Sequence, residues 1–407
     1  MKTELSTVLA ERISERADAI FSEVVTLRRE IHRHPELSYD EVQTTALITE
    51  YLLGLGITPE PPLLGTGVIA LIRGTHKSSK RTLVALRADI DALPVTEENQ
   101  HEFCSVEPGK MHACGHDMHT AMLLGAAKIL EEIKDELEGD VLLIFQPAEE
   151  KAPGGAKPLL DAGLFKRFNP SVIIAQHCFP HIETGKVALC KGSFMAAADE
   201  LYFTVTGQGG HASAPHKVAD PILAAAHIIT AVQHIVSRVV PPHEPAVISI
   251  TSIHGGHATN VIPSQVTMSG TMRTMHEDVR ALLHQRLRQT VMHTAEAFDV
   301  KAELEIRHGY PVLFNDPAIT SQAMSCCSEY LGSGNVIECE PIMTAEDFAY
   351  YLQACPGTFW QIGTGTSQHE KSNTLHSPTF NPEELALKTG TGLLAYTAAR
   401  FLSLSPR

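Results

Sequence analysis

Residues 119–150 read HTAMLLGAAKILEEIKDELEGDVLLIFQPAEE, and this stretch decides the fold class. Residues 119–137 carry apolar side chains at helical spacing, which predicts an amphipathic helix. Residues 139–150 continue as an apolar run that ends in acidic residues, which predicts a buried strand. A helix that leads into a buried strand is the repeating step of an α/β layer with a largely parallel sheet.

The flanking sequence repeats this pattern. The apolar β-type runs GVIALIRG (67–74) and TLVALRADID (82–91) precede the stretch, and SVIIAQHC (171–178) follows it. Before them, residues 23–56 predict two helices, the second starting at a Ser38 cap with Glu41 three residues on. We therefore predict a mixed, largely parallel sheet with flanking helices.

The pattern changes between residues 189 and 308. Apolar periodicity there predicts strand, helix, strand, strand, helix and strand, an order that matches a ferredoxin-like α+β unit. Helices and strands then alternate again toward the C-terminus. We predict an α/β domain made of residues 1–188 and 309–407, interrupted by an inserted domain of residues 189–308.

Composition narrows the class of protein. The chain has 407 residues, 43% hydrophobic and 19% charged, with a formal charge of −15, which is typical of a soluble protein and argues against nucleic acid or an anionic membrane as partner. We find no apolar run near the roughly 18 residues that span a bilayer and no secretory signal. The eight cysteines form no disulfide framework, so we expect a reduced, cytoplasmic protein.

Unusual polar residues follow the predicted strands of the α/β domain, where open α/β sheets bind their ligands. Asp89 and Asp91 follow the strand at 82, and HACGHDMH (112–119) comes after the next loop. Glu149 and Glu150 end the strand at 139, and His177 ends the strand at 171. A late histidine, His376, follows the strand FWQIG and a polar loop.

Cysteine, histidine and glutamate together suit Zn²⁺, or Mn²⁺ and Co²⁺ where oxygen ligands dominate. Each residue also has a simpler interpretation. Cys114 could be a buried thiol or a catalytic nucleophile, and His177 a core histidine. Glu149 and Glu150 could begin a solvated helix, and the two aspartates could form a turn before Pro94. Their convergence at successive strand ends favours a metal site.

Motifs along nearly the whole chain resemble those of a known family. They are RREIHRHPELSYDE, RADIDALPV, MHACGHDMHTAMLLGAA, FQPAEE, GQGGHASAPH, GGHATNVIP, GTMRT, AEDFAYY and LHSPTF, in this order. They are similar to the dinuclear metallo-amidohydrolases of the aminoacylase/carboxypeptidase family. The most similar branch contains hippurate hydrolase, indole-acetyl-amino-acid hydrolase and N-acetyl-diaminopimelate deacetylase.

The resemblance implies a cofactor of two divalent ions per subunit (Zn²⁺, Mn²⁺, Co²⁺ or Ni²⁺) and hydrolysis of the amide bond of small N-acyl amino acids or amino-acid conjugates. A water molecule activated by the metal would attack, with Glu149 as general base. The implied metal ligands are Cys114, which would bridge the two ions, and His116, Glu150, His177 and His376.

The resemblance also assigns roles outside the ligand set. His211 of the inserted domain would stabilise the oxyanion, from the neighbouring subunit in dimers, and Asn260 and Arg273 would hold the substrate carboxylate or oxyanion. Asp89 or Asp91 would orient a ligand histidine, and we favour Asp89. Supporting residues of lower weight are His112, Asp117, His119 and Glu346.

Several alternatives stay open at this point. A dipeptidase or carboxypeptidase would use the same two-metal site. A non-catalytic metal-binding protein would lack a ligand or the base, and a cysteine hydrolase would need no metal. We further expect residues 189–308 to act as a lid and dimerisation domain, with hinge closure over substrate, in a homodimer or homotetramer.

Overall fold

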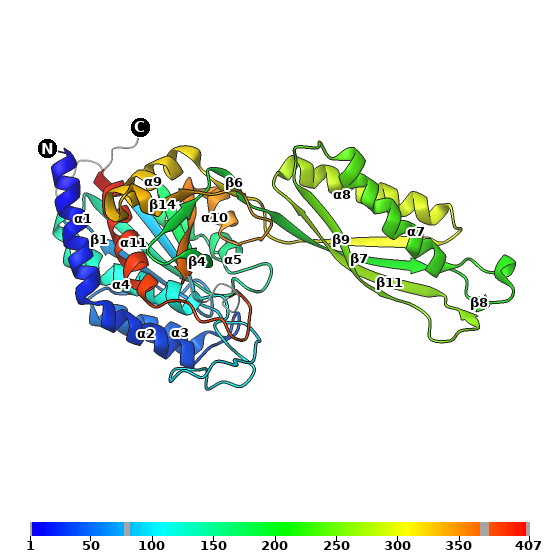
Figure 1. Ribbon diagram of the computed structural model, residues 1–407, viewed down its shortest axis with the longest axis horizontal. Coiled ribbons are helices and arrows are strands. Elements are labelled where there is room, and N and C mark those ends of the chain that lie inside the picture. The colour runs from blue at the N-terminus through cyan, green and yellow to red at the C-terminus, as the bar shows by residue number, and fades with distance from the viewer. Residues whose placement is uncertain (1, 77–81, 367–373, 404–407) are drawn as a thin grey trace. The chain divides into compact units, whose positions relative to one another are not determined.

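The computed structural model describes residues 2–76, 82–366 and 374–403 of the chain. The chain forms two compact units (Figure 1). Unit 1 comprises Met1–Gly192, Phe314–Glu340 and Asp347–Arg407, and unit 2 comprises Ser193–Leu313 and Pro341–Glu346. The sequence analysis did not expect residues 341–346 in the second unit, because this short segment carries no strand or helix pattern.

A seven-stranded sheet forms the centre of unit 1, in the order β1-β3-β2-β4-β15-β5-β14. β3, β2, β4 and β15 run parallel to one another. β1 is antiparallel to β3, and β5 is antiparallel to β15 but parallel to β14. The prediction of a mixed, largely parallel sheet is therefore confirmed. The strands are β1 (Val68–Arg73), β2 (Thr82–Asp89), β3 (Gly139–Gln146), β4 (Val172–Glu183), β5 (Val187–Leu189), β14 (Val336–Glu338) and β15 (Gly357–Gly365).

The register of the central strands determines where their polar ends lie. Asp89 at the end of β2 pairs with Gln146 at the end of β3. Both strands are almost wholly apolar before these residues and are buried on both faces, as expected for parallel strands covered by helices. Because β2 and β3 are parallel and in this register, the chain leaves both at one edge of the sheet.

Helices cover both faces of this sheet. On one face α4, α9 and α11 pack into the main apolar core together with α1. On the other, Phe348 contacts Tyr351 of α10 and Phe359 of β15, and Phe165 of α6 contacts Tyr351. The helices are α1 (Lys2–Ala19), α2 (Phe21–Arg33), α3 (Val42–Gly54), α4 (His116–Glu132), α5 (Ala156–Asp161), α6 (Leu164–Phe168), α9 (Pro317–Leu331), α10 (Ala349–Ala354) and α11 (Leu385–Ser403), with 3₁₀ turns at Lys134–Glu136 and Ser333–Asn335.

The predicted helix start at Ser38 is wrong. α3 begins at Val42, and its N-cap residue, Glu41, makes no side-chain capping bond. The Ser38 hydroxyl instead donates to Asp91 Oδ2 at 2.6 Å. The buried carboxylate of Glu41 accepts from the backbone amide of Ala148 at 2.8 Å. The Ser38 and Glu41 side chains therefore do not cap the helix. They bind the segments that follow β2 and β3 instead.

Unit 2 contains a four-stranded antiparallel sheet in the order β12-β7-β11-β9. Its two helices connect β7 to β9 and β11 to β12, which is the ferredoxin-like arrangement that we predicted. Its elements are β7 (Ala197–Thr206), α7 (Pro221–His234), β9 (Ala246–His254), β11 (Gln265–Thr274), α8 (Glu277–Glu296) and β12 (Lys301–His308). Smaller elements are β6 (Gly192–Met195), β8 (Gly210–His211), β10 (Val261–Ile262), β13 (Leu313–Asn315), a 3₁₀ turn at Pro215–Lys217 and a π-helical turn at Ile235–Val239.

α7 begins with Asp220, whose side chain accepts from the amides of Ile222 and Leu223, followed by Pro221 at the first helical position. Together with the turn that follows, Pro221–Val239 is long and apolar enough to cross a membrane by length and composition alone, which our sequence analysis overlooked. One face of this helix, including Ile228 and Val232, is buried in the core of unit 2. Packing on the sheet thus accounts for that apolar face.

Candidate metal centre

The chemically distinctive side chains of unit 1 come from the polar ends of its strands. Asp89 ends β2 and Asp91 follows it, while Glu149 and Glu150 lie just beyond β3. His177 projects from the neighbouring strand β4. The turn that leads into α4 supplies two more of these side chains, Cys114 and His116, and the helix begins at His116.

Gly115 makes the Cys114–His116 turn possible. Its φ angle is 88°, in the left-handed region that side chains with a Cβ rarely adopt. A Cβ added there would lie 3.2 Å from Cys178 Cβ and 3.3 Å from its Sγ. The turn therefore needs glycine for both its backbone angle and its close approach to β4.

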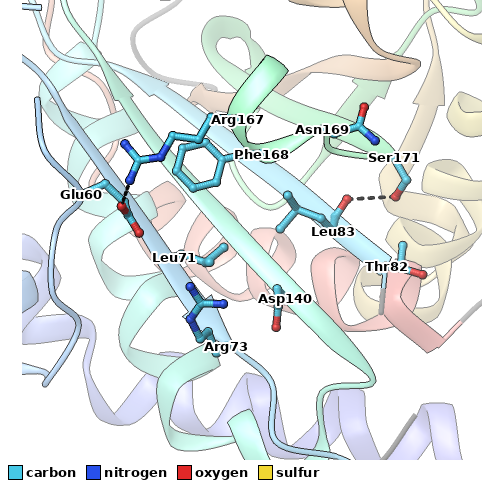
Figure 2. A pocket seen from close by; sticks show the side chains of 10 residues that line it. All are labelled: Glu60, Leu71, Arg73, Thr82, Leu83, Asp140, Arg167, Phe168, Asn169 and Ser171. Atoms are coloured by element: carbon cyan, nitrogen blue, oxygen red, sulfur yellow. Dashed lines mark hydrogen bonds and ion pairs between the residues drawn. The ribbon is translucent and has the colours of Figure 1, made fainter. Parts of the chain in front are cut away.

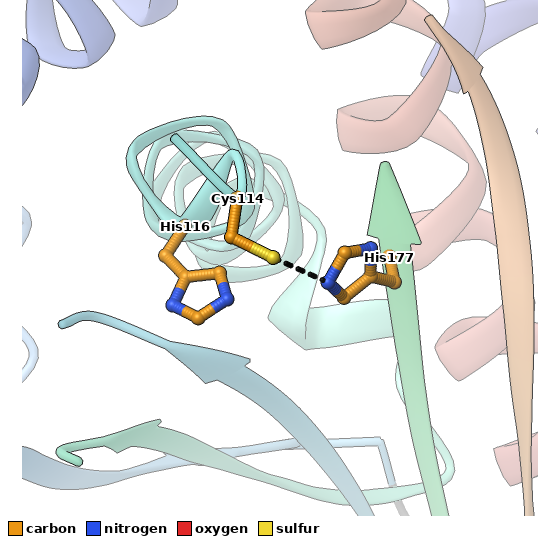
Figure 3. Close-up of side chains that lie close together, drawn as sticks. All are labelled: Cys114, His116 and His177. Carbon is orange, nitrogen blue, oxygen red and sulfur yellow. Dashed lines mark hydrogen bonds between the residues drawn. The ribbon is translucent and has the colours of Figure 1, made fainter. Parts of the chain in front are cut away.

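The structure brings the five predicted metal ligands together. Cys114 Sγ lies 3.4 Å from His177 Nε2 (Figure 3). Glu150 Oε1 lies 3.9 Å from His116 Nε2 and 3.4 Å from His376 Nε2. Potential donor atoms of Cys114, Glu150 and His376 also lie within 4.8 Å of one another. The backbone amide of His376 donates to the Ala113 carbonyl at 2.7 Å, which holds this loop beside Cys114.

Most of the polar loop that we expected before His376 lies outside the described residues. His376 itself has a φ angle of 63° and a side chain that is 56% exposed, in contrast to the buried His116 and His177. It therefore stands at the open side of the cluster.

The two buried histidines present the same nitrogen to the cluster. His116 Nδ1 lies 2.9 Å from the Asp91 carbonyl, and His177 Nδ1 lies 2.9 Å from the Cys178 carbonyl. Since a carbonyl only accepts, each Nδ1 carries a hydrogen, and in the neutral ring each Nε2 has a free lone pair. Among the described residues, neither His116 Nε2 nor Glu150 Oε1 has a hydrogen-bond partner, although both atoms are buried.

Charge in the cluster also fits a cation. Burial raises the pKa of the Cys114 thiol well above its usual value, and the carboxylates of Glu150, Glu149 and Asp89 raise it further. Burial opposes protonation of His116, yet Asp89, Asp91 and Glu150 raise its pKa to about 10. A divalent cation at these atoms would take the place of protons and offset the negative charge. The thiolate, imidazole and carboxylate donors are those that Zn²⁺ and similar ions bind.

The two candidate aspartates have different partners. Asp91 Oδ1 lies 3.3 Å from His116 Nδ1 and accepts from the Glu149 amide at 3.0 Å, and its Oδ2 accepts from the Glu150 amide at 2.9 Å. Asp89 Oδ1 lies 2.5 Å from His119 Nδ1, and its Oδ2 lies 3.6 Å from His116 Nε2. Asp91 therefore contacts a predicted ligand and the glutamate pair directly.

His119 positions β4. Its Nε2 accepts from the Cys178 amide at 2.9 Å, so its other nitrogen, Nδ1, donates to Asp89. With both nitrogens engaged, His119 holds the backbone next to His177 in place.

A buried network below this site was missed by the sequence analysis. Arg87 donates to Gln146 Oε1 at 2.9 Å, Asp89 Oδ2 at 2.7 Å and Asp347 Oδ1 at 2.8 Å. Gln146 Nε2 and the Ala156 amide both donate to Asp347 Oδ2. The sequence did place a charged residue inside an apolar strand, Arg87 in LRAD, and another in AEDF, Asp347. That these two side chains meet depends on the order of the strands, which the sequence does not reveal.

The remaining supporting residues lie around the ligand turn. Asp117 accepts from Arg28 at 2.7 Å and contacts His32 Nδ1 at 2.8 Å. His112 is fully buried, burial lowers its pKa to about 4, and neither ring nitrogen has a hydrogen-bond partner within the described ranges. Glu346 is buried and belongs to unit 2.

The predicted substrate-binding residues lie in unit 2. His211 of β8 pairs with Val261 of β10, and the Ala212 amide donates to the Asn260 carbonyl at 3.0 Å. His211 Nδ1 accepts from the Ser213 amide at 3.1 Å, so Nε2 carries the imidazole hydrogen when the ring is neutral. Arg273 of β11 is half-buried and donates to the Met343 carbonyl at 3.4 Å.

A separate pocket of about 760 Å³ lies at the starts of the parallel strands, away from their carboxyl ends (Figure 2). Thr82, Asp140 and Ser171 line it, and an ion pair between Glu60 and Arg167 crosses one side. It contains none of the donor clusters described above, so its size does not mark it as the reactive site.

Known proteins resemble this chain over nearly its full length. N-acetyl-L-cysteine deacetylase of Bacillus subtilis is 40% identical over 93% of this chain and 88% of its own length. IAA-amino acid hydrolase ILR1-like 5 of Arabidopsis thaliana is 38% identical over 96% of this chain and 89% of its own length. Thermostable carboxypeptidase 1 of Saccharolobus solfataricus is 39% identical over 97% of this chain and 99% of its own length.

A solved structure agrees with these relatives. The YXEP protein of Bacillus subtilis, described as a dinuclear metal-binding peptidase from the M20 family, superposes with a TM-score of 0.82 and 34% identity, over 95% of this chain and 99% of that one. The profile of peptidase family M20/M25/M40 matches residues 85–400. The chain therefore belongs to peptidase family M20/M25/M40, and it is a metal-dependent hydrolase of amide bonds.

Proposed function

We propose that this chain hydrolyses the amide bond of N-acyl amino acids or amino-acid conjugates, releasing a carboxylic acid and an amine. The observation that carries the proposal is the cluster of His116, Glu149 and Glu150, whose potential donor atoms lie within 4.8 Å of one another. In an adjacent carboxylate pair, one member can hold a metal while the other moves protons. The deacetylase and the amino-acid conjugate hydrolase among the relatives support the substrate class.

Two divalent ions would be held by Cys114, His116, Glu150, His177 and His376. The buried atoms His116 Nε2 and Glu150 Oε1, which have no hydrogen-bond partner among the described residues, support this assignment, as does the dinuclear relative of known structure. When bound, such ions lower the pKa of water and polarise the amide carbonyl. Zn²⁺, Mn²⁺, Co²⁺ and Ni²⁺ are compatible with a mixed set of sulfur, nitrogen and oxygen donors.

Glu149 is the proposed general base. Its buried carboxylate would take the proton of the attacking water and deliver it to the leaving amine. Asp91 holds the Glu149 and Glu150 amides and faces His116 Nδ1, so we now assign to Asp91 the positioning role for which the sequence favoured Asp89. Asp89 would support the same histidine from the other side, with Oδ2 3.6 Å from His116 Nε2, and it also holds His119.

His211, Asn260 and Arg273 would bind the oxyanion or the substrate carboxylate. The neutral His211 ring offers an Nε2–H donor, which is the group that a developing oxyanion needs. Arg273 can offer two parallel N–H donors to a carboxylate. These roles require the domain of residues 189–308 to act as a lid, as the sequence analysis expected.

We also propose that the protein is a homodimer or homotetramer in a reducing compartment such as the cytoplasm. All eight cysteines are free thiols, which supports a reducing environment. The formal charge of −15 supports a small-molecule substrate over nucleic acid or an anionic membrane. Light scattering of the purified protein would give the oligomeric state.

The experiment that tests the function combines a substrate panel with Glu149→Gln. Acetyl, benzoyl and indole-acetyl amino acids are compared with free dipeptides, using wild-type protein loaded with each metal. We expect the acylated amino acids to have the higher kcat/KM, and E149Q to keep its metal while kcat falls about 10²–10⁴-fold.

The second candidate is a dipeptidase or carboxypeptidase at the same centre, favoured by the carboxypeptidase relative. Faster cleavage of free dipeptides or of C-terminal residues would replace the first proposal with this one. Undiminished turnover in E149Q would remove Glu149 as the base under either proposal.

A further inference from the structure

A second cluster of metal-binding side chains lies outside the centre described above. It consists of His32 in α2 and of Glu97 and His101 in the loop that follows β2. One potential ligand atom of each lies within 4.8 Å of the others. The side chains are well shielded, with His32 0%, Glu97 4% and His101 16% exposed. None of the three has a role in the proposed hydrolysis.

The separations within this cluster match those of ligands around one ion. Glu97 Oε1 lies 3.2 Å from His32 Nε2 and 3.3 Å from His101 Nε2. In a tetrahedral zinc site with bonds of about 2.0–2.1 Å, neighbouring ligand atoms lie roughly 3.3 Å apart. The two separations from Glu97 Oε1 therefore match the edges of such a tetrahedron, and water can occupy a remaining corner.

The second nitrogen of each histidine has its own partner. His32 Nδ1 lies 2.8 Å from Asp117 Oδ2, the arrangement in which a carboxylate orients a metal-bound histidine. His101 Nδ1 lies 3.3 Å from Cys104 Sγ. Both Nε2 atoms are thus directed toward Glu97, whose Oε2 is held by the Ser105 amide at 2.6 Å.

His101 provides a second, independent observation. Its Nε2 is buried and has no hydrogen-bond partner among the described residues, even though Glu97 Oε1 is only 3.3 Å away. The contact is short enough for a hydrogen bond but does not have the direction of one. A metal ion between the two atoms would satisfy His101 Nε2. Glu97 Oε1 already accepts from Asn99 Nδ2 at 3.0 Å and has a second lone pair for the ion.

We propose that His32, Glu97 and His101 form an additional site for one divalent transition-metal ion of the Zn²⁺ type. The ion would fasten the loop of residues 95–105 to α2. Its role is structural, because none of its ligands takes part in the proposed proton transfers.

The competing arrangement is a protonated His32 that donates to both Asp117 and Glu97. Burial and the charge of Arg28 lower the pKa of His32, but Asp117 and Glu97 raise it above its usual value, so the two carboxylates attract a proton as well as a metal. A proton and a metal cannot both occupy His32 Nε2. Counting bound metal therefore separates the two arrangements.

The test uses full-length protein that is stripped with a chelator, reloaded with Zn²⁺ and freed of excess metal. Zinc per chain is measured by mass spectrometry in wild type, His101→Gln and His293→Gln, the last being a control because its side chain is 76% exposed and lies on α8. We expect H101Q to hold about one zinc fewer than wild type and H293Q to hold the same number. Turnover of H101Q should stay within about twofold of wild type.

Equal zinc in wild type and H101Q would overturn the proposal. Loss of zinc together with turnover would place the effect at the catalytic centre and would overturn it as well. Should H101Q fail to fold, crystals of the wild type soaked in Zn²⁺ decide the question. An anomalous peak within bonding distance of His32 Nε2 and His101 Nε2 supports the site, and density without such a peak rejects it.

Discussion

Asp91 accepts a hydrogen bond from the backbone amide of Glu149 at 3.0 Å, so a carboxylate after β2 fixes the segment after β3. The same side chain accepts from the Glu150 amide and from Ser38 Oγ, and it faces His116 Nδ1. One carboxylate thus determines the position of the proposed base and of two proposed ligands.

Replacing Asp91 with asparagine should therefore impair metal binding and turnover together. The amide nitrogen of the substituted side chain would face donors from which the carboxylate now accepts, so the loop after β3 would shift. We expect metal affinity or kcat to fall by about 10–100-fold, measured by metal titration and steady-state kinetics.

Asp161→Asn is the matched control, because the Asp161 side chain is 66% exposed and pairs only with Lys157 among the described residues. It should leave both quantities unchanged. Wild-type metal affinity and kcat in D91N would show that the amides of Glu149 and Glu150 need no such acceptor.

Removing the metal should abolish hydrolysis. We expect dialysis against a chelator to inactivate the protein, and Zn²⁺, Mn²⁺, Co²⁺ or Ni²⁺ to restore activity to different extents. Apo protein should also melt at a lower temperature, because the folded state loses a ligand that the unfolded chain binds weakly. Metal content, turnover and Tm are measured on the same samples.

Cys114→Ala and Cys178→Ala form a matched pair for the thiol. Both thiols are buried, but Cys114 belongs to donor clusters and its Sγ lies 3.4 Å from His177 Nε2. C114A should lose metal and activity, whereas C178A should keep both. A metal-free protein that retains full turnover but is inactivated by thiol alkylation would instead indicate a cysteine hydrolase.

Gly115→Ala should weaken the centre through the backbone. Alanine at a φ of 88° costs about 1–2 kcal/mol, and its Cβ would also crowd Cys178 at 3.2 Å. Displacement of Cys114 and His116 should lower metal affinity, which competition with a coloured chelator measures.

Gly109→Ala separates the effect of the backbone angle from the effect of the contact with Cys178. Gly109 has a φ of 78°, but a Cβ added there meets nothing within 4 Å. It should lose stability by the backbone effect alone and keep its metal affinity. Equal metal affinity in G115A and G109A would mean that contact with Cys178 does not position the ligands.

Asp199→Asn should destabilise unit 2 in a pH-dependent way. The buried Asp199 carboxylate accepts from Arg280 at 2.9 Å, contacts His284 Nε2 at 2.6 Å and accepts from the Gly309 amide at 3.1 Å. Burial opposes the charge, but Arg280 and His284 hold the pKa of Asp199 well below its usual value. Breaking a buried pair costs about 3–5 kcal/mol, which is the loss expected near pH 7.

The direction of the pH dependence follows from that lowered pKa. A depressed pKa stabilises the folded state above the unfolded value of about 4, and the stabilisation disappears as pH falls below it. The difference between wild type and D199N should therefore shrink from pH 5 toward pH 2, measured by denaturant-dependent hydrogen exchange of β7. Asp278→Asn on α8 is the control. If the stability difference between wild type and D199N did not change with pH, the assignment of an ionised Asp199 would be refuted.

Much of the fold was readable from the sequence because its signals are local. The apolar runs at 82, 139 and 171 became adjacent parallel strands, and the alternation between 197 and 308 became the sheet of unit 2. The short strands β5 and β14 were missed, since three residues are too few to establish a period. Ser38 was misassigned because a cap motif cannot reveal a competing partner more than fifty residues away.

The candidate site residues could be recognised in the sequence because metal-binding residue types follow the predicted strands. Their individual roles could not, because those depend on contacts with residues far away in the sequence. Asp89 and Asp91 are indistinguishable in RADID, and only the placement of α4 against β2 brings Asp91 to His116 Nδ1 and Asp89 to His119 Nδ1. Arg87 and Asp347 meet across 260 positions of sequence, and His101 meets His32 through a loop with no periodic pattern.

The sequence by itself thus determined the layered α/β fold, the ferredoxin-like insertion and the set of residues from which a metal centre could be built. Periodicity and residue chemistry are local properties, and they survive in a single strand or helix. Only the tertiary structure decided which carboxylate orients which histidine, and that His32, Glu97 and His101 converge on one point. Those pairings arise from strand order and helix packing, which bring together side chains that no local pattern relates.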